Sequence, residues 1–321
     1  MSIIEQAAKR MEELRRAGVD VPWTATGVDA SQAPATPAEP TAAPVAVAPT
    51  APVVTQAAPV AAAPAVVAPV AEHDPNKPVR RSRSIELDLA RLAQNGFLVP
   101  GAERSQIEAE FRIIKRPLIK NATGESAGPV ERANLIMVTS ALPGEGKTFS
   151  AINLAMSIAM ELDHTVLLVD ADVVRPSVLD RLGLPPAKGL LDVLTNPGTD
   201  LADVMLKTNI PKLTILPAGT ANSRTTELLA SVAMEELLNE LAKSYQDRIV
   251  IFDAPPLLPS TESRVLATRM GQVMVVVEAD KTSRATVSQA FATLETCPVV
   301  MATLNKCRGK VANSAYGYYA V

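Results

Sequence analysis

The chain has 321 residues, enough for one or two domains with a buried core, and its formal net charge is −3. This balance lacks the excess of basic residues that marks most nucleic-acid-binding proteins, so we expect no nucleic-acid partner. The two cysteines, Cys297 and Cys307, cannot form a disulfide framework, and a single possible pair favours a reducing compartment.

Residues 1–18 are predicted to form a short amphipathic helix. Ser2 and Glu5 have the spacing of a capping box, and Gly18 suits the end of the helix. Apolar residues recur every three or four positions, as on one helix face: Ile4, Ala7, Met11 and Leu14. This face would pack either on the chain's own globular part or on a helix of a partner. Because the segment is charged throughout, it does not resemble a secretory signal.

Residues 19–84 are predicted to be a disordered linker rich in proline and alanine. Twelve of the 26 prolines lie between residues 22 and 78, and such a segment favours extended conformations and cannot build a core. The prolines also interrupt the charge-poor stretch 41–71, so no membrane-spanning helix is expected there. The basic cluster at 77–84 is either a solvated surface or a contact for anionic lipid headgroups or acidic partners.

Residues 85–130 are predicted to be a helical segment that leads into the main domain. Its apolar residues recur at spacings of four, three and four, which indicates an amphipathic helix: Ile107, Phe111, Ile114 and Leu118. We expect that helix to end within residues 121–128, where small and polar residues predominate.

Residues 131–308 are predicted to form the main domain. Six apolar runs resemble strands, at 135–140, 165–170, 213–218, 249–254, 273–278 and 299–305. Helical patterns lie between several of them, at 150–161, 225–243 and 284–296. Near-continuous Val, Leu and Ile runs separated by helices are typical of a parallel sheet covered on both faces. The expected fold class is therefore α/β, a mostly parallel β-sheet flanked by helices.

The first predicted strand of this domain is followed by ALPGEGKT at 141–148 and then by a helix. This matches the phosphate-binding pattern G-x-x-x-x-G-K-[ST] except at Ala141, and the order strand, loop, helix is the required one. Gly144 and Gly146 let successive backbone N–H groups point at phosphate oxygens. Lys147 would reach the β- and γ-phosphates, and the Thr148 hydroxyl would hold Mg²⁺. The alternative is a glycine turn that arose by chance.

Acidic residues end two further predicted strands. Asp170 and Asp172 close the run at 165–170, and Asp253 closes the run at 249–254. Carboxylates at the carboxyl edge of a parallel sheet could point towards a metal ion and phosphates. Helix capping is the alternative for one of the first two, since Pro176 is expected to begin the next helix.

These motifs together, PGEGKT, DAD followed by RP, and FDAPP, resemble those of the bacterial tyrosine kinases of exopolysaccharide operons. More narrowly, the chain is similar to the exosortase-associated tyrosine autokinases, from about residue 108 to the C-terminus. The resemblance implies a P-loop NTPase fold of the MinD/ParA-like branch, with ATP and Mg²⁺ as cofactors. It also implies transfer of the γ-phosphoryl of ATP to tyrosine.

The resemblance assigns roles to particular residues. Nucleotide binding would involve Pro143, Gly144, Glu145, Gly146, Lys147, Thr148, Phe149 and Asn305, of which Asn305 would contact adenine unless it is only a turn residue. Mg²⁺ would be held by Thr148, Asp172 and Asp253. Catalysis would depend on Lys147, Asp170, Asp172 and Asp253, with Asp170 favoured as the base.

The predicted tail at 309–321 supports the kinase interpretation independently. Three of the four tyrosines lie in it, Tyr316, Tyr318 and Tyr319. A cluster of tyrosines on a flexible end is what a phospho-acceptor needs. An aromatic end packed on the protein surface is the alternative.

Two positions depart from the family's pattern, and a third bears on an alternative. Val174 stands where the second acidic motif usually has arginine, and Arg175 follows it. Ala109 replaces the first acidic residue of a helix motif that mediates subunit contacts. Leu142 stands where MinD- and ParA-like ATPases carry an additional lysine. The absence of this lysine weakens the alternative that the chain is a positioning ATPase. A non-catalytic ATP-binding scaffold is the other alternative.

The resemblance also implies partners. A membrane polysaccharide co-polymerase, a chain-length determinant of the Wzz type, would activate the kinase as a separate protein. The chain would form a homo-oligomer, and a cognate tyrosine phosphatase would reverse its phosphorylation. We therefore expect a cytoplasmic protein held at the inner membrane through its partner, acting on exopolysaccharide synthesis or export.

Overall fold

The computed structural model describes residues 83–308, except residues 102–104, 127, 197, 222–224 and 245–247. The predicted helix at 1–18, the predicted linker up to residue 82 and the predicted tail at 309–321 lie outside the described residues. The three candidate acceptors, Tyr316, Tyr318 and Tyr319, therefore lie outside them as well.

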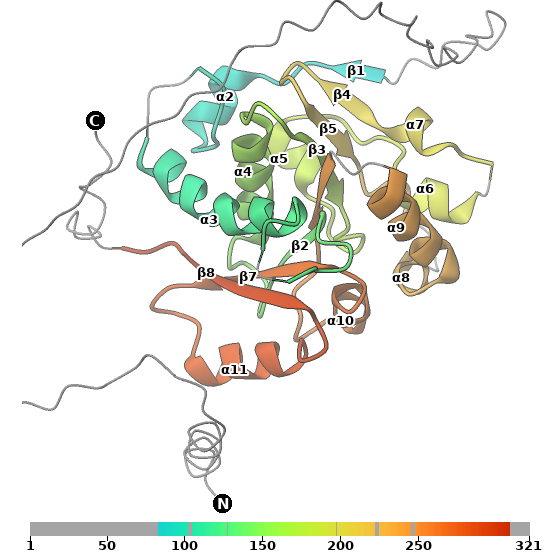
Figure 1. Ribbon diagram of the computed structural model, residues 1–321. Coiled ribbons are helices and arrows are strands. Elements are labelled where there is room, and N and C mark those ends of the chain that lie inside the picture. Colours follow the sequence, from blue (N-terminus) through green and yellow to red (C-terminus); the bar gives the residue numbers. More distant parts are fainter. Residues whose placement is uncertain are drawn as a thin grey trace, which may run out of the picture. The chain divides into compact units, whose positions relative to one another are not determined.

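A sheet of eight strands forms the centre of the described part (Figure 1). The strands are β1 Arg83–Ile85, β2 Leu135–Ser140, β3 Thr165–Asp170, β4 Leu206–Thr208, β5 Leu213–Leu216, β6 Arg248–Asp253, β7 Gln272–Glu278 and β8 Val299–Asn305. Their order in the sheet is β1-β4-β5-β3-β6-β2-β7-β8. Every neighbouring pair is parallel except β4 and β5. The prediction of a mostly parallel α/β fold is confirmed.

Helices cover both faces of this sheet (Figure 1). They are α2 Leu89–Gln94, α3 Gln106–Ala122, α4 Lys147–Ala159, α5 Val178–Leu182, α6 Leu190–Thr195, α7 Leu201–Val204, α8 Thr225–Leu229, α9 Val232–Ser244, α10 Thr261–Ala267 and α11 Arg284–Ala292. None of the described helices is both long enough and apolar enough to cross a membrane.

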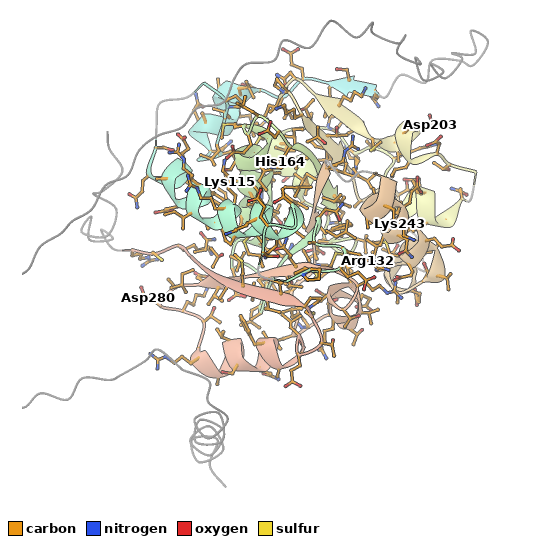
Figure 2. The ribbon with its side chains drawn as sticks, viewed as in Figure 1. Lys115, Arg132, His164, Asp203, Lys243 and Asp280 are labelled. Atoms are coloured by element: carbon orange, nitrogen blue, oxygen red, sulfur yellow. The ribbon has the colours of Figure 1, made fainter. Side chains whose placement is uncertain are left out.

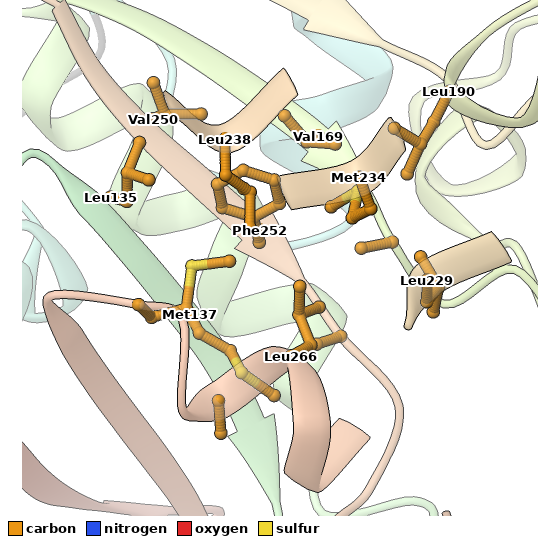
Figure 3. Packing of buried hydrophobic residues seen from close by; sticks show 14 of the residues in the cluster. Leu135, Met137, Val169, Leu190, Leu229, Met234, Leu238, Val250, Phe252 and Leu266 are labelled. Atoms are coloured by element: carbon orange, nitrogen blue, oxygen red, sulfur yellow. The ribbon is translucent and has the colours of Figure 1, made fainter. Parts of the chain in front are cut away.

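Two separate hydrophobic cores result from the alternation of side chains along the strands. In β6, Val250 and Phe252 belong to the core shared with α6–α11, whereas Ile249 and Ile251 belong to the core shared with α2–α5. Figure 3 shows Phe252 packed with Leu238 and Met234 of α9. Because both of their faces are covered, the strands β2, β3, β6 and β7 are buried at nearly every position, which explains their near-continuous Val, Leu and Ile runs.

The six predicted strands are all present, each within two residues of its predicted bounds. The three-residue strands β1 and β4 were not predicted, because strands so short show no periodicity. Residues 83 and 84 therefore lie in the sheet and not in the linker to which the sequence assigns them. The predicted helix at 225–243 is wrong in one respect, since it is divided into α8 and α9. Ser231 lies between the two, and its hydroxyl accepts the backbone N–H of Met234 in the first turn of α9.

The predicted amphipathic helix is α3, and its apolar residues pack on the core that contains α4. Lys115, labelled in Figure 2, points from α3 to α4. Its ammonium donates to Ser157 O at 2.6 Å and forms an ion pair with Glu161 Oε1 at 2.6 Å. The segment before the main domain is thus joined to it by both apolar and charged contacts.

Candidate active site

The loop predicted to bind phosphate connects β2 to α4. Gly144 and Gly146 have φ angles of 88° and 102°, in a region that residues with a side chain rarely adopt. Gly146 is also the N-cap of α4, and no side chain there bonds to the first N–H groups of the helix. These groups are free to bind an anion, which the positive end of the helix dipole also favours.

The end of β8 lies against this loop. Asn305 Nδ2 donates to Glu145 O at 2.9 Å, and Lys306 Nζ donates to Gly144 O at 2.7 Å. A Cβ atom added to Gly146 would lie 2.0 Å from Asn305 Nδ2. The fold therefore brings Asn305 from a distant part of the sequence to the loop, where glycine leaves room for it.

The side chain of Glu145 turns away from the loop's open side. It is 2% exposed, and its Oε2 accepts the N–H of Leu142 at 2.6 Å. Its Oε1 accepts the Thr282 hydroxyl and the N–H of Glu278. Only the backbone of Glu145 is therefore positioned to contact a nucleotide, and its carboxylate instead ties the loop to the end of β7 and to the segment that follows it.

Lys147 lies among carboxylates. Its Nζ is 2.7 Å from Asp172 Oδ2 and 3.6 Å from Asp253 Oδ1. The Thr148 hydroxyl donates to Asp253 Oδ2 at 2.6 Å and lies 3.0 Å from the Ser177 hydroxyl. The residues predicted to reach phosphates and metal are thus already joined to one another by charge-assisted contacts.

Asp170 and Asp253 end adjacent strands and are paired in the register of β3 and β6. Asp170 Oδ2 accepts the backbone N–H groups of Ser177 and Val178, both at 3.0 Å. Asp170 therefore caps the first turn of α5, the alternative that the sequence left open. The expectation that Pro176 begins this helix is wrong, because Ser177 is the N-cap and Val178 the first helical residue.

Burial and mutual repulsion change the proton affinity of these groups. Burial raises the pKa of Asp170 to about 7, with a further increase from the Asp253 charge. Burial also raises the pKa of Asp253 to about 6, although Lys147 and the Thr148 hydroxyl act against it. Burial lowers the pKa of Lys147, but the Asp253 and Asp172 carboxylates outweigh this and raise it above its usual value. Such a site favours an additional cation.

A cavity of about 910 Å³ opens over the loop. It is lined by Pro143, Gly144, Gly146, Lys147, Thr148, Phe149, Asp172, Val174, Arg175, Ser177, Arg181, Pro255, Pro256, Pro259, Ser260, Glu262, Asn305 and Lys306. Asp170 and Asp253 do not line it, since they are 1% and 0% exposed and lie beneath it. Of Asp170 and Asp172, only Asp172 lines the cavity.

Several lining residues were not predicted from the sequence. Arg175 and Arg181 are exposed cations with no ion-pair partner among the described residues. Ser177 directly follows the RP of the second acidic motif, and Lys306 directly follows Asn305. Their places in the chain could therefore have predicted that they lie near the site. No sequence pattern marks Arg181, because only the path of α5 brings it to the cavity.

The donor set fits a magnesium ion. Asp170 Oδ1 and Asp253 Oδ1 are buried and accept no hydrogen bond from the described residues. Among those residues, no group of three or more His, Cys, Asp or Glu side chains is arranged to hold a metal by itself. Magnesium usually takes only one or two carboxylates and completes its shell with water and phosphate oxygens. Asp253, with the Thr148 hydroxyl beside it, meets that requirement.

Comparison with known proteins agrees with this geometry. The sequence profile of the AAA domain family matches residues 133–306, more than half of the chain. The tyrosine-protein kinase YwqD of Bacillus subtilis (strain 168) is 33% identical over 191 residues, which cover 57% of this chain and 76% of YwqD. The putative tyrosine-protein kinase CapB of Staphylococcus aureus is 27% identical over 219 residues, covering 67% of this chain and 91% of CapB.

A solved structure is similar over the same region. The crystal structure of the chimerical protein CapA2B2 superposes with a TM-score of 0.54 at 25% identity, covering 69% of this chain and 92% of the other. The assignment of the chain rests on three findings: the shared fold, the loop that ends in Lys147 and Thr148, and the sequence identity to YwqD. The chain belongs to the AAA domain family of P-loop proteins and, within it, to the bacterial tyrosine-protein kinases.

Proposed function

We propose that this chain transfers the γ-phosphoryl group of ATP to tyrosine. The acceptors are Tyr316, Tyr318 and Tyr319 of another copy of the same chain. The observation that carries the proposal is the position of Lys147. It lies in a phosphate-binding loop, 2.7 Å from Asp172, which lines the same cavity. A phosphate-binding cation and a carboxylate thus meet where an acceptor hydroxyl must enter.

The loop performs the binding step in this proposal. The backbone N–H groups of residues 143–148 hold the phosphate oxygens, and Lys147 neutralises the β- and γ-phosphates. Asn305, at the end of β8, contacts the adenine. The Phe149 ring packs on Phe97, with the ring centroids 5.2 Å apart, and closes one side of the cavity.

Thr148 and Asp253 would hold a magnesium ion, and Asp172 is a further ligand candidate. Bound there, the ion supplies positive charge that offsets the charge on the transferred group. Asp253 is suited to this because its Oδ1 is buried without a hydrogen-bond donor.

Asp172 accepts the phenolic proton in this proposal. The sequence favours Asp170 as the base, but its carboxylate caps α5 and lies beneath the cavity, whereas Asp172 lines it. Phosphates compete with Asp172 for Lys147 and so free Asp172 Oδ2. A bond then forms between the phenolic oxygen and the γ-phosphorus as the bond to the β–γ bridging oxygen breaks. ADP leaves, and the proton passes to Asp172.

The biological setting follows from the family. We infer that phosphorylation controls the synthesis or export of an exopolysaccharide, and that a membrane co-polymerase of the Wzz type activates the kinase and brings it to the membrane. A cognate tyrosine phosphatase reverses the modification. A homo-oligomer lets one copy's tail reach a neighbour's site, and each phosphate added to the tail contributes about −1.5 to −2 charges.

The test compares two lysine variants for transfer of labelled γ-phosphoryl to tyrosine. Lys147→Met is expected to abolish the label, because it removes the charge that holds the phosphates. Lys243→Met is the matched control, since Lys243 is an exposed lysine of α9 (Figure 2) and does not line the cavity. Undiminished phosphotyrosine in purified Lys147→Met would refute the assignment of Lys147.

A further inference from the structure

The order of strands divides the cavity into two sides. The P-loop follows β2, which lies between β6 and β7, and the next strands outward are β3 and β8. Neighbouring strands are about 4.8 Å apart, so the ends of β3 and β8 are separated by about 19 Å. Asn305 lies on the β8 side, whereas Asp172 lies on the β3 side. A nucleotide whose base is near Asn305 leaves the β3 side to the acceptor.

A rigid wall of prolines borders that acceptor side. Pro255 O accepts the hydroxyls of Thr139 and Ser263, each at 2.6 Å. The next residues are fixed to the P-loop strand, because Leu257 N–H donates to Ser140 O at 2.8 Å. The Arg264 guanidinium also donates to the carbonyls of residues 257 and 258, at 2.9 and 2.7 Å. The wall therefore keeps its shape without a ligand.

Val174 faces the same cavity from the loop after β3. The two loops leave the sheet side by side, since Ala171 N–H donates to Asp253 O at 2.8 Å. Val174 is 60% exposed, so its side chain is accessible from the cavity. With Pro255, Pro256 and Pro259 it gives the cavity an apolar lining close to Asp172. Phosphates and metal do not require such a lining.

We infer that Val174 and Pro255, Pro256 and Pro259 form a subsite that binds the phenol ring of the acceptor tyrosine. The inference rests on the proposed function and specifies its substrate. An aromatic ring on apolar side chains is held by burial of its faces, with its hydroxyl left at the polar end of the site. Such a subsite selects tyrosine, because serine and threonine lack the ring that fills it.

The occupant is the tail of a second copy of this chain. The tail at 309–321 supplies three tyrosines within four positions, 316–319, and their rings match the apolar lining of the subsite. One ring at a time enters the subsite.

The experiment uses the full-length chain with Tyr316, Tyr318 and Tyr319 changed to serine, so that its own tail offers no ring. A synthetic peptide of residues 308–321 is the acceptor, and the same peptide with phenylalanine for each tyrosine is the inhibitor. Val174→Ser is expected to raise the KM for the peptide about fivefold, since it loses apolar contact. The inhibitor's affinity should fall by the same factor, while the Kd for ATP stays as in the reference chain. Val232→Ser is the control, because it makes the same substitution at a valine of α9 that is 73% exposed and does not line the cavity. It should alter none of these values.

Each outcome decides one proposal. An unchanged KM and an unchanged inhibitor affinity in both Val174→Ser and Pro259→Ala would overturn the ring subsite. A change in ATP affinity in place of peptide affinity would overturn it as well. If the reference chain transfers no phosphoryl group to the peptide, the proposed function fails. Calorimetric binding of the phenylalanine peptide still tests the subsite in that case, and equal binding to the reference chain and Val174→Ser would refute it.

Discussion

Replacing Gly146 with alanine is expected to destabilise the protein through two separable effects. The first is backbone strain, because φ at Gly146 is 102° and a residue with a Cβ atom pays about 1–2 kcal/mol in the left-handed region. The second is the approach of the new Cβ to Asn305 Nδ2, which would be 2.0 Å away. Asn305 must then move and lose its hydrogen bond to Glu145 O, at a cost of about 0.5–1.5 kcal/mol. The expected total is about 1.5–3.5 kcal/mol.

Gly144→Ala is the matched control. Its φ of 88° imposes similar strain, but a Cβ there would meet nothing within 4 Å. Urea unfolding followed by circular dichroism should therefore show Gly146→Ala to be less stable than Gly144→Ala by about 1 kcal/mol. In an Asn305→Ala background that difference should disappear. Equal stability of the two alanine variants, or a difference that persists without Asn305, would refute the reasoning.

Three further predictions concern stability without ligands. Because the pKa of Asp170 is raised to about 7 in the folded chain from 3.8, folding takes up a proton, and stability should increase as pH falls from about 8 to about 5. Asp170→Asn should weaken that increase in urea midpoints, and an identical increase would contradict it. The hydrogen bond from Lys115 lowers the pKa of Glu161 below 4.5, so its stabilisation is lost as pH falls below that value. Lys115→Met should lose less stability there than the unaltered chain, and equal losses would count against the pair. Leu118→Ala, at a fully buried position of α3, should cost about 3 kcal/mol; unchanged stability would show that α3 unfolds independently.

The parts of the fold that could be predicted are those with a long repeating signal. β2, β3 and β8 have the predicted bounds because each contains four consecutive apolar residues and ends on a polar one. β4 and β1 could not be found, since a three-residue strand is defined by its hydrogen-bonded neighbour and not by its own pattern. The division between α8 and α9 could not be predicted either, because it depends on one local contact, the cap that Ser231 provides for α9.

The candidate site shows the same division between local and long-range information. Gly144, Gly146 and Lys147 belong to one motif, so their spacing alone predicts the loop. Which of two nearby aspartates faces the cavity depends on the turn that follows β3, and the sequence favours Asp170 where the structure brings Asp172 to the cavity. The sequence likewise could not predict that the prolines after β6 border the site, because this depends on the pairing of β6 with β3.

The central claim, that the γ-phosphoryl group of ATP passes to tyrosines of the tail, is tested most directly by mass spectrometry. The purified full-length chain is treated with a tyrosine phosphatase, freed of it, and incubated with ATP and Mg²⁺. The intact mass should then rise in steps of one phosphate, and peptide mapping should place them at Tyr316, Tyr318 and Tyr319. Tyr245, the fourth tyrosine, serves as the internal reference and should stay unmodified. Hydrolysis of ATP with no added phosphate on any tyrosine would contradict the account.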